Sequence, residues 1–256
     1  DKKKVYFDRQ TYGGLQTEDP KLIALKEIVY TSQTFNADAD DNNWSGQLTV
    51  AYKPNRNINT FATFSTSYKP IGVNLGGLPR SNGETMIELA QIKPEYVTHF
   101  EVGLKSNPTP FSTVNLTLYN TDIKDYQTQV QTPDPGVNRG YLANAEKVRV
   151  RGVELDGNIR FKDNFSLYGA FAYTDGKYVT FKNAPVPLEE TGAPVAFKDI
   201  SNTILPGISK WAGSLGGEAL APGNFLGLTG RYFLGLDASY RSSFSSSPSV
   251  SKFLNI

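Results

Sequence analysis

Short segments in which apolar and polar side chains alternate recur along most of this 256-residue chain, each about ten residues long. From Trp44 to Tyr52 every second residue faces one way and is mainly apolar, while the residues between are small or polar. The run from Ile58 to Tyr68 repeats the pattern after a connector rich in Pro and Asn. Successive side chains of a strand point to opposite faces, so this alternation predicts strands with one apolar and one polar face.

The connectors between the predicted strands alternate between short and long. The further strands are expected near Thr98–Leu104, Val114–Leu118, Val153–Phe161, Leu167–Tyr173, Trp211–Leu220 and Leu226–Tyr240. The short connectors are Lys53–Asn57, Asn107–Pro110, Lys162–Asn164 and Ala221–Asn224, and the long ones are Pro70–Pro94, Gln131–Leu142, Val179–Ser209 and the tail after Arg241. Outer-membrane barrels have short periplasmic turns and long extracellular loops, whereas a soluble sandwich has no reason to sort its loops in this way. The pattern therefore predicts an all-β, transmembrane antiparallel β-barrel segment.

Composition narrows the classes of function. The formal net charge is +1, so no basic face indicates a nucleic-acid partner, and the absence of cysteine removes disulfides and thiolate metal sites. Mean hydropathy is −0.37 and no apolar run approaches the ~18 residues that a membrane-spanning helix needs, which leaves a barrel possible.

Aromatic residues make up 12% of the chain and many stand near predicted strand ends. Interfacial girdles would have this distribution, although aromatic residues are also common in strands generally. One rim is expected to carry Tyr52, Phe111, Phe161, Phe165 and Phe225, and the other Trp44, Tyr68, Tyr126, Tyr178, Trp211 and Tyr240.

The number of strands and the chain ends predict an internal piece of a larger barrel. About eight to ten strands are expected, but small barrels rarely carry a loop as long as Val179–Ser209. Asp1 is not followed by the regions of a signal peptide, and the last residues read as the start of another strand. We expect residues 1–43 to form a loop plus a strand, and residues 44–256 to form strands, short periplasmic turns and long extracellular loops of one partial barrel domain.

Several blocks in this order resemble the C-terminal half of the barrel of TonB-dependent outer-membrane receptors of the siderophore-uptake type. They are Trp44–Pro54, Phe61–Asn74, Lys93–Lys105, Tyr119–Tyr126 and Asn144–Leu155, the last being the most specific. The resemblance implies a barrel of about 22 strands with a plugged lumen. It also implies the outer membrane of a Gram-negative bacterium, contact with its lipid bilayer, a ligand such as an iron chelate held at the outer loops and plug, and energy from TonB. Under this resemblance we expect the plug domain, the TonB-contacting segment and the closing strands to lie outside these 256 residues, and no cofactor is implied.

The most specific block places charged residues on a strand with an apolar face. Arg151 would share a face with Val153, so we expect a β-bulge at Gly152 that inverts the facing of later side chains. Arg149 and Glu154 would then belong to a lumen-side charge network that braces strands or contacts the plug. The alternative is a solvated lumen wall without a special partner.

The sequence contains no set of residues spaced for catalysis or metal binding. It therefore predicts that the protein is not an enzyme. His99 is the single histidine, so a histidine pair for zinc is impossible, and we expect it on the polar face of its strand. Asp38, Asp40 and Asp41 resemble the start of a calcium loop, but Thr49 stands where the bidentate glutamate should be. The adjacent carboxylates of Glu189–Glu190 lie in a predicted loop that cannot hold catalytic geometry.

Three functions remain open. The first is active uptake of a scarce, bulky nutrient, above all a ferric siderophore. The second is a passive outer-membrane channel or porin, and the third is a soluble all-β ligand-binding domain. Tyr126, Arg139, Tyr141 and the loop 179–209 are placed to face a ligand, but the sequence assigns no substrate-binding residue.

Overall fold

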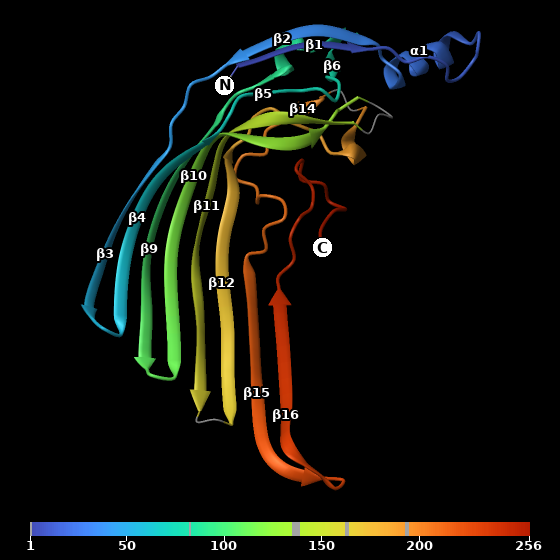
Figure 1. The fold of residues 1–256 in the computed structure, drawn as a ribbon. Helices are drawn as coiled ribbons and strands as arrows, with labels where there is room; N and C mark the ends of the chain where they lie inside the picture. The colour runs from blue at the N-terminus through green and yellow to red at the C-terminus, as the bar shows by residue number, and fades with distance from the viewer. Residues whose placement is uncertain (1, 82, 135–138, 162–163, 193–194) are drawn as a thin grey trace.

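The computed structural model describes residues 2–81, 83–134, 139–161, 164–192 and 195–256. Their main feature is one eight-stranded sheet in the order β16-β15-β12-β11-β10-β9-β4-β3, in which all neighbours run antiparallel. Its strands are β3 (Gly46–Asn55), β4 (Ile58–Lys69), β9 (Glu95–Thr109), β10 (Ser112–Gln131), β11 (Gly140–Phe161), β12 (Phe165–Thr180), β15 (Trp211–Phe225) and β16 (Leu228–Arg241). The eight predicted strands and the antiparallel all-β class are confirmed. The sheet is curved but open, because β3 and β16 form its two edges (Figure 1).

Two central strands are much longer than the alternation predicted. β10 has 20 residues and β11 has 22. A tilted strand needs only about 9–11 residues to cross a bilayer, so each of these strands is about twice as long as a membrane-spanning strand has to be. The extension is at the end that carries the long connectors, where β10, β11 and β12 rise toward the loops (Figure 1).

The short connectors lie together at the opposite end of the sheet (Figure 1). Part of one predicted connector, Lys162 and Asp163, lies outside the described residues. The turn predicted at Ala221–Asn224 is wrong: β15 continues through Pro222, and the chain reverses at Leu226–Gly227, both of which have positive φ. A turn of this kind suits the twist of a hairpin. Proline is tolerated at residue 222 because β15 pairs with β12 only as far as Ala219, which leaves this stretch bound to β16 alone.

The long connectors form a layer above the sheet. An N-terminal ribbon of β1 (Lys2–Arg9) and β2 (Gln33–Asp40), with helix α1 (Pro20–Val29) between them, lies over the top of this layer (Figure 1). The sequence does not predict this helix, because only a loop and a strand are expected in residues 1–43. Among the described residues, no helix combines the length and the apolarity needed to cross a bilayer.

Short elements complete the loop layer. They are β5 (Gly72–Val73), β6 (Arg80–Ser81), β7 (Glu84–Thr85), η1 (Ile87–Leu89), β8 (Gln91–Ile92), β13 (Ala184–Pro185), η2 (Leu188–Glu190) and β14 (Phe197–Lys198). The main apolar core lies here, where the connector after β12 packs on the β10–β11 extension. Its buried members are Val130, Tyr141, Ala145, Val148, Tyr178, Phe181, Ala184, Ile200 and Leu205. The largest fully buried side chains are thus in the loop layer, and the sheet below leaves large apolar side chains exposed.

Candidate functional site

The two faces of the sheet differ in chemistry as the alternation predicted. Cross-strand register places Leu48, Phe64, Phe100, Leu116, Leu155, Phe171, Leu215 and Leu236 on one face, together with other apolar residues. Many of these are exposed, with Leu215 63% and Leu236 73% accessible. We call this the apolar face and the opposite one the polar face. A continuous exposed apolar face of this size needs a non-aqueous environment.

Toward the loops the apolar face becomes charged. Arg149 of β11 donates to Asp122 of β10 through Nε at 2.8 Å and Nη2 at 3.3 Å. Arg151 is 3.0 Å from the Asp175 carboxylate of β12. Lys147 lies 3.8 Å from Asp122, and Lys177 lies 3.9 Å from Asp175. We call the set of Asp122, Lys147, Arg149, Arg151, Asp175 and Lys177 the charged ladder.

Gly152 is not a bulge, and the expectation that it inverts the facing of β11 is wrong. The register of β11 runs without interruption through Gly152 on both sides, opposite Tyr119 and Thr174. The shift between β11 and β12 is instead at Lys147/Val148. Arg149, Arg151 and Val153 consequently share the apolar face. Each of the two arginines on this face is paired with a carboxylate of a neighbouring strand, Arg149 with Asp122 and Arg151 with Asp175.

Arg149 and Glu154 therefore lie on opposite faces, so the prediction that they form one lumen-side network is wrong. Glu154 is five positions after Arg149 on a strand with unbroken register, and an odd offset sends the two side chains to opposite faces. Glu154 is on the polar face beside Asp156, whose carboxylate accepts from the Asn115 amide at 2.9 Å. A lumen role for Glu154 stays a prediction.

His99 lies on the polar face, as expected. Its ring contacts the Thr121 hydroxyl at 2.8 Å and the Glu101 carboxylate at 3.3 Å. Within the described ranges no cluster of three or more His, Cys, Asp or Glu side chains could hold a metal ion. Asp40 of the calcium-like sequence lies on the exposed ribbon at 3.4 Å from Lys2.

The aromatic girdle is only partly where the sequence placed it. Tyr173 and Trp211 have ring centroids 4.5 Å apart, directly adjoining the charged ladder along β12, and Tyr240 is exposed at the same end. At the other rim Phe161 and Phe165 pair at 5.8 Å. The assignment of Tyr178 to the girdle is wrong, because it is fully buried in the loop core.

Two buried amides fasten the loop layer to the strand extension. The Asn74 side chain donates to the carbonyls of Leu89 and Leu142 at 2.8 and 2.9 Å and accepts from the Leu142 N–H at 2.8 Å. Gln127 donates to the carbonyls of Pro70 and Lys93 at 2.9 and 3.0 Å. Sequence reasoning missed both, since no local pattern marks an amide whose partners are distant in the chain. Buried amides that bond to distant backbone groups in this way favour a single loop arrangement.

A hollow of about 450 Å³ lies among the loops that these amides hold. Its lining includes Glu88, Leu89, Tyr141, Asn144 and Phe197, from three different connectors and strands. Burial, and then the neighbouring Asp134 carboxylate, raises the pKa of Tyr141 above its ordinary value. The hollow combines an aromatic ring, an amide and a carboxylate at the loop end of the molecule.

The other residues expected to face a ligand are distributed differently. Tyr126 packs against the loop core, and Arg139 donates to the Val29 carbonyl at 3.4 Å. Parts of the connectors 131–142 and 179–209 lie outside the described residues. Of the named candidates, Tyr141 lines the loop hollow, together with Asn183 and Phe197 of the connector 179–209.

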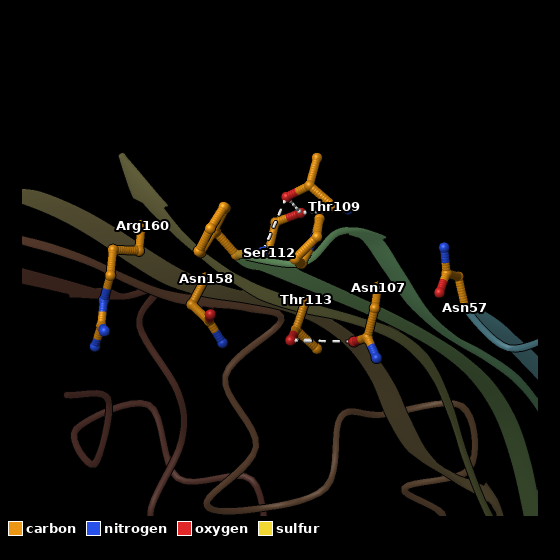
Figure 2. A pocket seen from close by; sticks show the side chains of 9 residues that line it. Asn57, Asn107, Thr109, Ser112, Thr113, Asn158 and Arg160 are labelled. Atoms are coloured by element: carbon orange, nitrogen blue, oxygen red, sulfur yellow. Dashed lines mark hydrogen bonds between the residues drawn. The ribbon is translucent and has the colours of Figure 1, made fainter. Parts of the chain in front are cut away.

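A second hollow of about 540 Å³ lies at the short-turn end (Figure 2). Asn57, Asn107, Thr113, Asn158 and Arg160 line it, and the Thr113 hydroxyl donates to the Asn107 amide oxygen at 3.3 Å. Its lining is polar and comes from the ends of β9, β10 and β11 and from the β3–β4 turn. The described residues around it offer no catalytic arrangement.

Residues 11–253 match a sequence model described as the TonB dependent receptor-like β-barrel. A probable TonB-dependent siderophore receptor, PiuA, of Acinetobacter baumannii is 28% identical over 162 residues, which are 61% of this chain and 20% of that protein. An uncharacterized TonB-dependent receptor of Haemophilus influenzae is 26% identical over 181 residues, 68% of this chain and 48% of the relative. The chain thus spans from a fifth to about half of the length of these relatives.

Two solved structures resemble the fold. The ferric yersiniabactin uptake receptor FyuA from Yersinia pestis has a TM-score of 0.61 at 16% identity, covering 89% of this chain and 30% of FyuA. The siderophore receptor PiuA from Acinetobacter baumannii has a TM-score of 0.51 at 19% identity, with coverages of 87% and 32%. At these identities the likeness concerns the fold alone.

Proposed function

Because the chain belongs to the TonB-dependent receptor β-barrel family of the Gram-negative outer membrane, we propose that it forms part of the wall of a nutrient-uptake receptor driven by TonB. The family consists of transporters and not of enzymes. The apolar face then contacts lipid, and the polar face lines the lumen. The long connectors are extracellular, and the short turns are periplasmic.

The observation that carries the proposal is the family match across residues 11–253. The geometry supports it, since the sheet has one exposed apolar face and an ordered loop layer at one end. An ordered loop layer supported by buried amides suits selection of a ligand at the outer rim.

We further propose that the cargo is a ferric siderophore. The descriptions of PiuA as a probable siderophore receptor and of FyuA as a ferric yersiniabactin uptake receptor support this class of ligand. The loop hollow near Tyr141 is a candidate contact for it, because an aromatic ring and the Asn144 amide suit a chelate with aromatic and carbonyl groups.

Growth of a deletion strain on defined ferric siderophores under iron limitation tests the cargo. Loss of growth on at least one siderophore, restored by the full-length gene, is the expected result. Unchanged growth on every iron source would contradict siderophore uptake.

A passive channel is the competing function, because its lumen is polar as well. It is distinguished by measuring uptake in a strain with inactive TonB. Active transport predicts that uptake stops, whereas uptake that continues at the same rate would identify a passive channel.

A further inference from the structure

We propose that the charged ladder binds phosphate groups of an outer-leaflet lipid. This inference goes beyond nutrient uptake and rests on the face and the depth at which the ladder lies. It concerns the outside of the barrel wall, so it does not depend on which cargo is carried.

The order of side chains along each strand places the ladder at the depth of lipid headgroups. On the apolar face of β12, Phe171 is followed by Tyr173, then by Asp175 and Lys177. Aromatic residues of barrels mark the interface between hydrocarbon and headgroups. The first ladder residue on β12, Asp175, is the next residue after Tyr173 on the same face, toward the extracellular loops. Its charges therefore face the headgroups of the outer leaflet.

The charge of the ladder is suited to an anion. It contains the four cations of Lys147, Arg149, Arg151 and Lys177 against the two carboxylates of Asp122 and Asp175, a net charge of +2. Lys124 stands opposite Lys147 in register and adds to the excess. The four cationic side chains remain between 32% and 56% exposed. Basic clusters at headgroup depth attract anionic lipids.

The two carboxylates orient the arginines but occupy only some of their N–H donors. Asp122 engages two nitrogens of Arg149, and Asp175 engages the Nε and one terminal nitrogen of Arg151. Each guanidinium has five N–H donors, so several stay available for an oxyanion. Same-face neighbours along a strand are about 7 Å apart and adjacent strands about 5 Å apart, so one phosphate is within reach of side chains from two strands.

The competing explanation is that the pairs only brace β10, β11 and β12 against each other. Opposite charges across strands do stabilise sheets. Each carboxylate does bridge two cations, Asp122 to Lys147 and Arg149 and Asp175 to Arg151 and Lys177, but the resulting net charge of +2 is not required for bracing. The two explanations differ in whether a phosphorylated lipid binds.

The test uses the full-length receptor purified in detergent and freed of lipid. Diphosphoryl lipid A and its dephosphorylated form are titrated in mixed micelles, and binding is measured by native mass spectrometry. We expect the Arg149→Gln/Arg151→Gln variant to bind the phosphorylated lipid at least about tenfold more weakly, and the dephosphorylated lipid with unchanged weak affinity. Arg149→Lys/Arg151→Lys should retain most of the binding.

The matched control is Lys105→Gln/Arg231→Gln, which removes the same charge from the polar face and should bind the lipid normally. Heat-dependent migration in gels verifies that every variant is folded. Three results would overturn the proposal: equal binding by wild type and the ladder variant, an equal loss in the polar-face control, or inorganic phosphate competing as strongly as the lipid, which would indicate a general anion site.

Discussion

Tyr119 lies across Gly152, its cross-strand partner, and its hydroxyl meets that of Thr174 on the next strand at 3.2 Å. A Cβ at residue 152 would stand 2.7 Å from the Tyr119 hydroxyl and closer still to the Tyr173 carbonyl. Phe61 covers Gly103, and Tyr168 covers Gly216, in the same way on the same face. Gly152, in the most specific sequence block, thus leaves space for the Tyr119 ring on the lumen wall.

Gly152→Ala is expected to lower the free energy of unfolding by about 1–3 kcal/mol, because the added methyl group overpacks against Tyr119 and the backbone. Chemical unfolding of the refolded barrel in detergent measures the loss. Gly223→Ala is the control, since its nearest neighbour would be Tyr232 at an ordinary 3.6 Å. Equal stability of the two variants would contradict the close packing at Gly152.

Asn74→Ala is expected to release the connector 70–94 from β11 while leaving the sheet intact. The substitution removes three hydrogen bonds and leaves buried partners unsatisfied, at a cost of about 1–3 kcal/mol in local stability. Hydrogen exchange should accelerate in residues 70–94 and at Leu142 but remain unchanged in β9. Asn115→Ala, which removes one exposed hydrogen bond, is the control. Unchanged exchange in the connector would show that Asn74 does not hold it.

Alkaline pH is expected to loosen the loop core before the sheet. Burial beside Asp134 raises the pKa of Tyr141, so the folded protein retains the phenolic proton at a pH where the unfolded chain releases it. The associated stability is complete below the ordinary tyrosine pKa of about 10 and declines above it. Tyr141→Phe should reduce this alkaline loss, as followed by proteolysis of the loops. An identical alkaline response in Tyr141→Phe would refute the role of this group.

The positions of the strands could be predicted because alternation has a period of two residues and needs no tertiary information. Arg151 shows the limit of the alternation. The period of two residues correctly places Arg151 on the face of Val153, and the predicted bulge at Gly152, which would move this charge away from an apolar face, is wrong. Strand length resolves the conflict, since β11 extends past the bilayer. That length could not be deduced from the sequence, because the two faces exchange character in the extension: Val148 and Tyr178, on the side of the polar face, are buried in the loop core, while the opposite face carries the charged ladder.

The sequence predicts the loop layer only as long connectors, without the short elements and contacts inside it. Asn74 and Gln127 bond to segments 68 and 57 residues away, so neither carries a local signature. The turn prediction at Pro222 is wrong for a related reason. A proline fits within β15 at this position because the pairing of β15 with β12 ends at Ala219, and strand pairing cannot be read from the local sequence. Structural features that depend on contacts between residues distant in the chain are therefore the ones that local sequence patterns do not predict.

The assignment of the two faces is tested most directly at adjacent residues of β10. Leu116 lies on the apolar face between Leu104 and Leu155, and Thr117 lies on the polar face opposite Glu154. Leu116→Arg and Thr117→Arg add the same charge one residue apart. The free energy of unfolding of the full-length receptor in lipid vesicles should fall by about 2–4 kcal/mol for Leu116→Arg and by less than about 1 kcal/mol for Thr117→Arg. Equal losses, or the larger loss at Thr117, would contradict a barrel wall with lipid on the Leu116 side.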